Sequence, residues 1–295
     1  MGSSNAYHLP SNAVWLITGC STGIGRALAS HVARHETSRL TATARKVADL
    51  DYLPDSPNVL KLVLDVTSQD SVDNAMSAVL DKWGRLDVVV NNAGFNIQGD
   101  AEAISDAEAR KLLETNFWGT VMVTKHATRI MRQENPKSDN GAIGGVIMSV
   151  TSLGGRIAFP GNSFYHASKF AVEGLIESIS KEVRPEWNIH YSLIEPGGVK
   201  TNYTTSMKTV TPLPDYAAPD TPARVVEAMV ADPESSKAWA DPQSVAEVMY
   251  NVVSRGKTIP LRVPLGSDSW NIQKAELERA IRELEVVKEL SYQVW

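Results

Sequence analysis

Short apolar runs rich in β-branched residues alternate with helix-forming segments along most of the 295-residue chain. Segments with helical periodicity, among them 25–34, 68–83, 106–133 and 163–183, separate most of these runs. The order strand, helix, strand is typical of βαβ units, in which parallel strands form a sheet with helices on both faces. The sequence therefore predicts an α/β fold, a single Rossmann-like doubly wound domain with a seven-stranded parallel sheet. The predicted strands are 13–18, 40–44, 58–66, 86–91, 145–150, 189–194 and 258–263.

Three segments lie outside this alternation. Residues 1–12 are predicted to be a flexible lead-in to the domain, which spans 13–295. Residues 201–244, after the sixth strand, are rich in proline and lack strand signals, so we expect an irregular lid over a substrate. The sequence of 268–290 predicts a charged helix. We expect this helix to pack on the body of the chain, and the alternative is that it binds a partner. Its apolar residues recur every three or four positions, at Leu277, Ile281, Leu284 and Val287.

Composition argues against several classes of function. The net charge is -5 and no dense run of Lys and Arg occurs, so we expect no nucleic-acid partner and no polybasic membrane patch. The single cysteine, Cys20, excludes an internal disulfide, and the six histidines lack the spacing of metal ligands. No apolar run approaches the roughly 20 residues of a membrane span, and the first ten residues do not resemble a signal peptide. These features predict a metal-free cytoplasmic protein with no membrane partner.

A glycine-rich turn, Thr-Gly-Cys-Ser-Thr-Gly-Ile-Gly over 18–25, follows the first predicted strand and opens the first helix. Glycines there let the backbone approach a pyrophosphate, and the N–H groups and dipole of a helix N-terminus favour an anion. The strand, turn and helix context predicts dinucleotide binding, although the spacing is not G-x-G-x-x-G. Cys20 in this turn is interpreted as a lining residue without a function of its own, with a redox switch as the alternative.

Tyr165 and Lys169 are four residues apart in a predicted helix and therefore share one face. A nearby ammonium group lowers the pKa of a phenol from its ordinary value near ~10, which suits the phenol to general acid/base catalysis. An isolated pair of this kind usually belongs to a helix surface. Ser152, at the end of the fifth predicted strand, is a candidate partner, and Ser149 and Thr151 compete with it. Strand alternation places Ser152 on the face opposite to these two residues.

These motifs together resemble the short-chain dehydrogenase/reductase family over about residues 13–200. The resemblance implies a catalytic tetrad of Asn116, Ser152, Tyr165 and Lys169. In that family the serine polarises a carbonyl group, the tyrosine is the general acid/base, and the lysine lowers the pKa of the tyrosine and binds the nicotinamide ribose. The asparagine holds a water that links the lysine to solvent.

The resemblance also implies a set of cofactor-binding residues. They belong to the glycine-rich turn, to the ends of the second, third and fourth strands, to the tyrosine and lysine pair and to a Pro-Gly-x-x-x-Thr motif after the sixth strand. The set is Gly19, Ser21, Thr22, Gly23, Ile24, Gly25, Arg45, Asp65, Val66, Asn92, Ala93, Gly94, Tyr165, Lys169, Pro196, Gly197, Val199 and Thr201.

The end of the second strand bears on the choice between NADP(H) and NAD(H). An acidic residue there binds the ribose of NAD, whereas a nearby Arg accommodates the 2'-phosphate of NADP. This chain has no acid at that point, and Arg45 and Lys46 follow the strand, so NADP(H) is favoured. The second basic residue that the family carries within the glycine turn is missing, which leaves NAD(H) as the alternative.

The implied function is the NADP(H)-dependent interconversion of a ketone and a secondary alcohol on a bulky hydrophobic small molecule. Apolar side chains near the motifs predict the substrate contacts, which are Phe95, Leu153, Phe159 and Tyr203. The long lid is similar to that of hydroxysteroid and retinol dehydrogenases, and the combination resembles reductases of fungal secondary metabolism. The alternatives are an enzyme that couples reduction to epimerisation or cyclisation, and a non-catalytic NADP(H)-binding sensor. The family also implies a homodimer or homotetramer formed through the helices that contain Asn116 and Tyr165.

Overall fold

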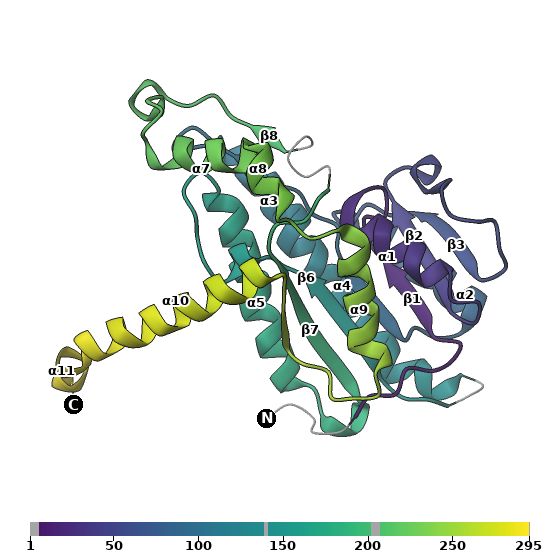
Figure 1. The fold of residues 1–295 in the computed structure, drawn as a ribbon. Coiled ribbons are helices and arrows are strands. Elements are labelled where there is room, and N and C mark those ends of the chain that lie inside the picture. Colours follow the sequence, from purple (N-terminus) through teal and green to yellow (C-terminus); the bar gives the residue numbers. More distant parts are fainter. Residues whose placement is uncertain (1–5, 139–140, 202–206, 295) are drawn as a thin grey trace.

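A computed structural model describes residues 6–138, 141–201 and 207–294 of the chain. Seven parallel strands form one sheet in the order β3-β2-β1-β4-β6-β7-β9 (Figure 1). The predicted α/β fold and strand number are confirmed, while the last strand lies a few residues later than predicted. The strands are β1 Val14–Ile17, β2 Arg39–Ala44, β3 Val59–Val63, β4 Val88–Asn91, β6 Gly145–Val150, β7 Ile189–Pro196 and β9 Arg262–Leu265.

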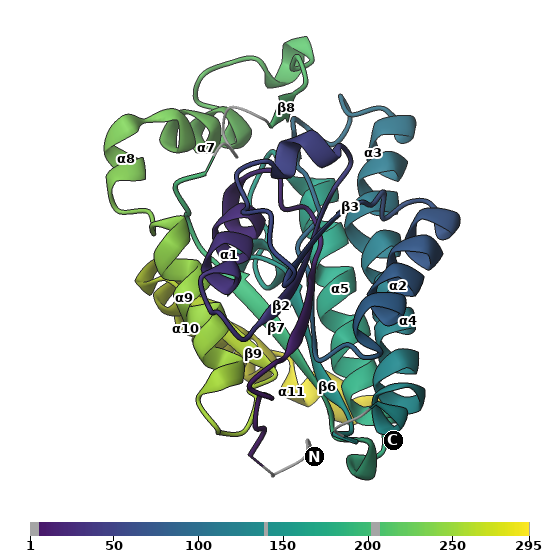
Figure 2. The ribbon, with the colours of Figure 1, turned by 90° about the vertical axis from the view of Figure 1, so that its right-hand side faces the viewer.

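Helices cover both faces of the sheet, as Figure 2 shows. Alternate strand residues point to opposite faces, so Trp15 and Ile17 pack on one side and Val14 and Leu16 on the other. The first side is covered by α1 (Gly23–Ala33) and α9 (Pro242–Ser254). The second is covered by α2 (Gln69–Trp83), α4 (Gly119–Gln133) and α5 (Ser163–Glu182). Two hydrophobic cores therefore enclose the sheet.

The helix predicted over 106–133 is interrupted. It consists of α3 (Asp106–Leu113), a π-helical turn (Glu114–Trp118) and α4. A π turn inserts one extra residue into the helical spacing, and such turns occur frequently at functional sites. The turn contains Asn116, one of the residues of the predicted tetrad.

The expectation that residues 201–244 are irregular was wrong for their described part, whereas their role as a lid stays a prediction. A short strand β8 (Lys208–Thr209) pairs in parallel with β5 (Ile97–Gln98), and two helices, α7 (Pro222–Ala231) and α8 (Pro233–Lys237), follow. Three of the prolines that suggested irregular structure, Pro222, Pro233 and Pro242, lie in the first turns of α7, α8 and α9, where the missing N–H of proline costs no helical hydrogen bond. Ion pairs join this segment to the chain around α3: Arg224 pairs with Asp100, which follows β5, and Lys208 pairs with Glu108 of α3.

The C-terminal helix also differs from expectation. It is present as α10 (Ser267–Val286), followed by α11 (Lys288–Ser291), and its first turns pack on the body through buried Ser269 and Gln273. Farther along, α10 extends away from the body (Figure 1), and Leu277 and Leu284 are 52% and 67% exposed. The expectation that its apolar residues pack on the same chain is therefore wrong, and the alternative of a partner stays a prediction.

The predicted N-terminal lead-in is packed over its described part. Tyr7 is 4% exposed, its N–H donates to the Lys257 carbonyl oxygen at 3.1 Å, and its ring meets that of His190 edge to face. Residues 6–12 form no helix or strand, as expected, but they lie against the body of the domain. Among the described residues, no helix combines the length and the apolar character that a membrane span requires.

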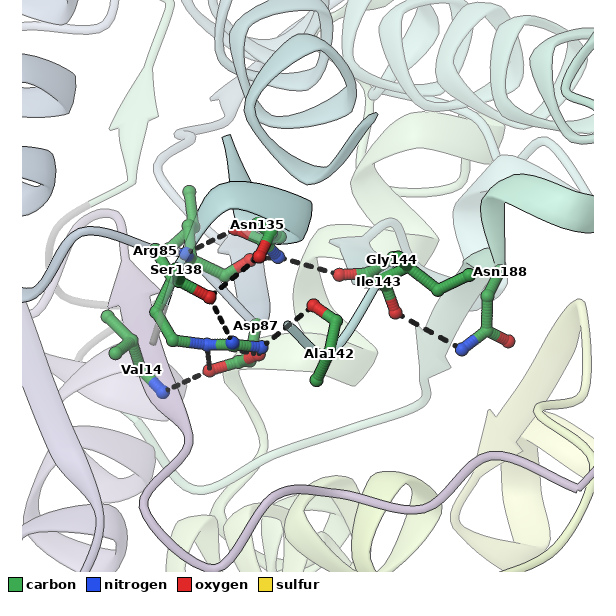
Figure 3. Close-up of polar contacts among 10 residues, drawn as sticks. Val14, Arg85, Asp87, Asn135, Ser138, Ala142, Ile143, Gly144 and Asn188 are labelled. Atoms are coloured by element: carbon green, nitrogen blue, oxygen red, sulfur yellow. Dashed lines mark hydrogen bonds and ion pairs between the residues drawn. The ribbon is translucent and has the colours of Figure 1, made fainter. Parts of the chain in front are cut away.

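A buried ion pair holds the amino-terminal edge of the sheet (Figure 3). Arg85 and Asp87 are 3% and 1% exposed, and the Arg85 Nε lies 3.1 and 3.0 Å from the two carboxylate oxygens. Asp87 Oδ2 also accepts from the Val14 N–H at 2.8 Å, and Arg85 donates to Ser138 Oγ at 2.7 Å. Nearby, the Asn135 side chain bonds both the N–H and the carbonyl oxygen of Leu86. We call Arg85, Asp87 and these contacts the amino-edge cluster.

Candidate active site

The glycine-rich turn after β1 and the Asn-Asn-Ala-Gly segment after β4 are joined by hydrogen bonds. Thr18 Oγ1 accepts from the N–H groups of Asn92 and Ala93 at 2.9 and 3.0 Å. The Asn92 side chain donates in return to the carbonyl oxygens of Thr18 and Gly19. β1 and β4 are neighbours at the point where the strand order reverses, which is where open α/β sheets bind their ligands.

Two glycines let the turn approach its own backbone and the Asn-Asn-Ala-Gly segment closely. Gly19 has a φ of +70°, and a Cβ atom there would lie 2.9 Å from Ala93 Cα. A Cβ atom on Gly25 would lie 2.4 Å from the Gly19 carbonyl oxygen. A side chain at either position would collide with this backbone, so the glycines let the turn pack tightly and bring the N-terminus of α1, where N–H groups and the dipole favour phosphates, to the crevice. A hollow of about 350 Å³ lies here, lined by Ser21, Thr22, Gly23, Arg26, Ala27, Ser30, Lys200, Thr201, Pro242 and Gln243.

Cys20 points away from this hollow into the core. Its side chain is fully buried, and Sγ lies 3.2 Å from the Ile17 carbonyl oxygen as a donor. Burial raises the pKa of the Cys20 thiol to about 12. A thiol held neutral in this way is a poor nucleophile, so the structure favours a packing role over a redox switch.

Sequence reasoning missed two residues at this turn. The Arg26 guanidinium lies 3.9 Å from the centre of the Tyr52 ring, and the Tyr52 hydroxyl donates to the Cys20 carbonyl oxygen at 2.8 Å. Tyr52 therefore contacts both the backbone of the turn and the guanidinium group of Arg26. Arg26 could have been identified from the sequence, because this basic residue directly follows the last glycine of the turn. No local pattern identifies Tyr52.

The residues predicted for the adenosine end of the cofactor follow β2 and β3. Arg45 comes directly after β2 and is exposed. Asp65 Oδ1 accepts from the Thr67 N–H at 2.9 Å and from its hydroxyl at 2.7 Å. These hydrogen bonds, with a smaller contribution from the charge of Arg45, lower the pKa of Asp65. Val66 is buried and would contact a Cβ atom on Gly119 of α4.

Tyr165 and Lys169 are neighbours on α5, as their spacing predicts. Lys169 Nζ lies 5.7 Å from the centre of the Tyr165 ring and donates to the Val150 carbonyl oxygen at 2.8 Å. Lys169 is 7% exposed, and burial lowers its pKa to about 8, whereas the charge of Glu173 acts in the opposite direction. The lysine is therefore a desolvated cation beside a half-buried phenol.

Asn116 joins the Asn-Asn-Ala-Gly segment to α5. Its Oδ1 accepts from the Phe95 N–H at 3.0 Å, and its Nδ2 donates to the Phe95 carbonyl oxygen and to Ser168 Oγ. A Cβ atom on Gly94 would lie 3.0 Å from Asn116 Oδ1 and 3.7 Å from Lys169 Nζ. Gly94, Asn116 and Lys169 therefore converge, although they come from three separate elements.

The structure also distinguishes the three hydroxyls at the end of β6. Ser149 is buried and accepts from the Asn91 side chain, and Thr151 is buried and donates to Glu173 Oε1 at 2.7 Å. Ser152 is only half-buried, and its Oγ accepts from the Gly154 N–H at 2.9 Å. A hydroxyl that accepts one bond can still donate another, so Ser152 keeps a proton for a ligand oxygen.

His166, next to Tyr165 on α5, supports the turn that begins at Ser152, which we call the serine turn. It is buried, and its Nδ1 lies 2.8 Å from the Gly154 carbonyl oxygen. Burial lowers the pKa of His166, which favours the neutral ring. The histidine therefore fixes the turn that begins at Ser152 to α5.

The predicted substrate residues divide into three groups. Phe95 and Tyr165 pack against the same buried cluster around Ile97 and Leu112. Leu153 opens the turn after Ser152, and the Phe159 ring lies 5.7 Å from that of His166. Tyr203 lies outside the described residues. The three described residues are thus apolar side chains, one in the cluster that Tyr165 also packs against and two near Ser152 and His166.

Similarity to known proteins agrees with this geometry. The short chain dehydrogenase family matches residues 13–211. Oxidoreductase calM of Penicillium decumbens is 46% identical over 98% of this chain and 95% of its own, and human retinol dehydrogenase 8 is 30% identical over 84% and 79%. A solved short-chain dehydrogenase from Streptomyces avermitilis superimposes with a TM-score of 0.82 at 29% identity, covering 97% of this chain and 99% of that one. The chain belongs to the short-chain dehydrogenase family of oxidoreductases.

Proposed function

We propose that the protein is an NADP(H)-dependent oxidoreductase that interconverts a ketone and a secondary alcohol on a bulky hydrophobic molecule. One observation carries this proposal. Lys169 lies beside the Tyr165 ring and borders Gly94, as Asn116 does, and the half-buried Ser152 is held in a turn that packs on the same helix. This group lies beside the crevice between the glycine-rich turn and the Asn-Asn-Ala-Gly segment.

In the reductive direction, a bound nicotinamide would supply the hydride to the carbonyl carbon, and the residues below would act on the carbonyl oxygen. Ser152 donates a hydrogen bond to the carbonyl oxygen, where negative charge develops in the transition state. Tyr165 transfers its phenolic proton to the same oxygen. Lys169 stabilises the phenolate that remains and binds the cofactor ribose, and the Asn116 side chain holds the backbone beside the lysine. Gly19, Gly23 and Gly25 would accommodate the pyrophosphate, and Pro196, Gly197, Val199 and Thr201 the nicotinamide end.

Replacement of Tyr165 by Phe tests this assignment. The ring and its packing are retained while the exchangeable proton is lost, so turnover should fall at least ~1000-fold, the scale of a lost acid/base group together with its hydrogen bond. Affinity for NADPH, measured by fluorescence titration, should change less than about threefold. Phe164→Leu on the preceding position is the matched control and should keep turnover. Substantial turnover in Tyr165→Phe would contradict the proposed function.

The preference for NADP(H) rests on Arg45 and Arg26, which place positive charge near the second strand end and the glycine turn. We expect the unmodified enzyme to show a lower KM for NADPH than for NADH. Arg45→Asp should raise the KM for NADPH about tenfold or more, the scale of one lost charge-assisted bond, and leave that for NADH nearly unchanged. Arg39→Gln, at the opposite end of β2, is the control. Equal effects on both cofactors would contradict the NADP(H) assignment.

The substrate proposal rests on the apolar walls formed by Phe95, Leu153 and Phe159 and on the lid. Following NADPH absorbance with a panel of hydrophobic ketones should reveal turnover with bulky, apolar members. Product analysis separates a simple alcohol from an epimerised or cyclised product. Tight NADPH binding without oxidation across the panel would favour the sensor alternative instead.

We further propose a cytoplasmic homodimer or homotetramer. The two helices named by the family resemblance expose large apolar residues, Trp118 at 52% and Phe170 at 44%. A hollow of about 370 Å³ beside Trp118 adds to this face. Light scattering coupled to gel filtration should give twice or four times the mass of the chain, and Trp118→Glu should reduce it. Leu284→Glu on α10 tests the other exposed apolar face, and cell fractionation tests the location.

A further inference from the structure

The turn that carries Ser152 packs on α5 next to a carboxylate that the proposed mechanism does not use. Glu173 lies one helical turn after Lys169 and is 4% exposed. Its Oε1 accepts from Thr151 Oγ1 at 2.7 Å, and its Oε2 accepts from Arg262 Nε at 3.1 Å. Both carboxylate oxygens therefore have a partner, one directly after β6 and one on β9.

Glu173 reaches the proposed catalytic residues on two sides. A Cβ atom on Gly155, in the serine turn, would lie 3.2 Å from Glu173 Cγ and 3.4 Å from Lys169 Cβ. Thr151, which Glu173 holds, lies between Val150, whose carbonyl oxygen accepts from Lys169, and Ser152. A displacement of Thr151 would therefore move the serine and the lysine contact together.

We propose that Glu173 is a positioning residue for the proposed catalytic pair. Held by Thr151 and Arg262, it fixes the end of β6 against α5 and supplies the negative charge that balances the buried Lys169 ammonium. This inference rests on the proposed function, because it assigns a purpose to the surroundings of the tetrad.

The charges around Lys169 support this role. The charged or titratable groups near it and Glu173 come from α5 (Tyr165, Glu177), from the turn after β6 (Arg156), from β7 (Glu195) and from β9 (Arg262). Burial lowers the pKa of Lys169, and Glu173 is the group that opposes this effect. Burial also raises the pKa of Glu173, while the bonds from Thr151 and Arg262 favour its ionised form.

The same helix provides a matched control. Glu177, one further turn along α5, also bonds Arg262, with Oε2 2.6 Å from Nη2. Its side chain is 37% exposed, however, and it does not contribute to the pKa shift of Lys169. Glu173→Gln and Glu177→Gln thus remove a carboxylate from the same arginine, but only the first removes the charge near the lysine.

The first measurement is the pH dependence of the purified enzyme with NADPH and the best ketone of the panel. Glu173→Gln should lower kcat about tenfold with a smaller change in the KM for NADPH. The alkaline limb of the kcat/KM profile of Glu173→Gln reports groups of the free enzyme. It should shift to lower pH by about half to one unit, because the negative charge beside Lys169 is lost. Glu177→Gln should match the unmodified enzyme in both respects.

The second measurement needs no cofactor and no turnover. NMR titration of ¹³Cε-labelled lysine, with the Lys169 signal assigned by Lys169→Met, should show a downward shift of the midpoint in Glu173→Gln alone. Thr151→Val keeps the charge but removes the hydroxyl that Glu173 holds, so it should lower kcat with the Lys169 midpoint unchanged. Glu173→Asp, which keeps the charge, should keep the Lys169 midpoint of the unmodified enzyme. If Glu173→Gln does not fold, Thr151→Val tests the geometric part of the role through kcat.

Two outcomes would overturn the inference. One is a Lys169 midpoint in Glu173→Gln equal to that in Glu177→Gln. The other is an unchanged kcat in Thr151→Val, which would remove the geometric part of the role. Both leave the Tyr165→Phe result intact, so failure of this inference is distinguishable from failure of the proposed function.

Discussion

Arg262 and its three carboxylates, Glu173, Glu177 and Glu195, lie toward the carboxyl-terminal edge of the sheet, whereas the amino-edge cluster of Arg85 and Asp87 lies at the other edge. At the amino edge one cation meets one anion, and both carboxylate oxygens of Asp87 are bonded. Near the carboxyl edge one cation serves three anions, and neither oxygen of the fully buried Glu195 has a hydrogen-bond partner of normal geometry among the described residues.

The difference follows from what each edge does. An ion pair whose hydrogen bonds are all made stabilises the fold, and none of its groups has to change charge or contact a ligand. An excess of buried carboxylates costs stability and shifts pKa values, and such shifts are concentrated at functional sites. Burial, followed by the charge of Glu173, raises the pKa of Glu195 to about 7. Glu195 directly precedes the Pro196–Gly197 segment that we assign to the nicotinamide.

The largest expected effect is at the amino edge. Asp87→Ala leaves the buried Arg85 charge unpaired and removes the acceptor of the Val14 N–H, so stability to urea should fall by about 3 to 5 kcal/mol. Turnover per folded molecule should not change. The double variant Arg85→Met with Asp87→Leu, which removes both charges, should lose less. A loss below about 1 kcal/mol in the single variant would contradict a structural role for this cluster.

An intermediate effect, opposite in sign, is expected for Glu195→Gln. The pKa of Glu195 is raised on folding, so its contribution to stability is present below pH 4.5, declines as the pH rises toward 7, and is constant above that value. The variant should therefore gain about 1 to 3 kcal/mol relative to the unmodified protein between pH 5 and pH 8. Urea unfolding at a series of pH values measures this gain. A difference that does not depend on pH would show that Glu195 does not titrate in this range.

The smallest effect is expected for Glu177→Gln. The exposed carboxylate bonds Arg262 and Lys181, and these bonds lower its pKa to about 2. Solvent and salt screen exposed pairs, so the loss of stability should be the smallest of the three and should disappear near 1 M NaCl. A loss that persists at high salt would indicate that the pair is effectively buried, and the contrast between the two edges would weaken.

Much of the fold could be predicted because strands buried on both faces are near-continuous apolar runs. Val88 to Val90 and Val146 to Val150 are strands of this kind. The lid could not be read in the same way, since proline signals both irregular structure and a helix start. Capping residues before each proline, Thr221, Asp232 and Asp241, were the informative signal.

The candidate site could likewise be predicted only in part. The spacing of Tyr165 and Lys169 and the strand alternation that separates Ser152 from Thr151 are local, and the structure agrees with both. Contacts between distant segments carry no such pattern. Glu173 and Arg262 are far apart in the sequence and become neighbours only when β9 pairs with β7 beside α5. Nor does periodicity show where a helix such as α10 leaves the body, because an exposed apolar stripe has the same spacing as a buried one.

The π turn at Asn116 has a consequence for how this region tolerates insertion and deletion. Each residue of an α-helix advances about 100°, so one extra residue rotates everything before it relative to everything after it. With that rotation, Ala109 and Leu112 of α3 belong to the buried cluster that Phe95 packs against, while Ala127 and Ile130 of α4 face the sheet. Deleting Thr115 would remove the offset and turn one of these faces toward solvent. Deleting this one residue would therefore break the packing of either α3 or α4, although every other residue of the two helices stays the same.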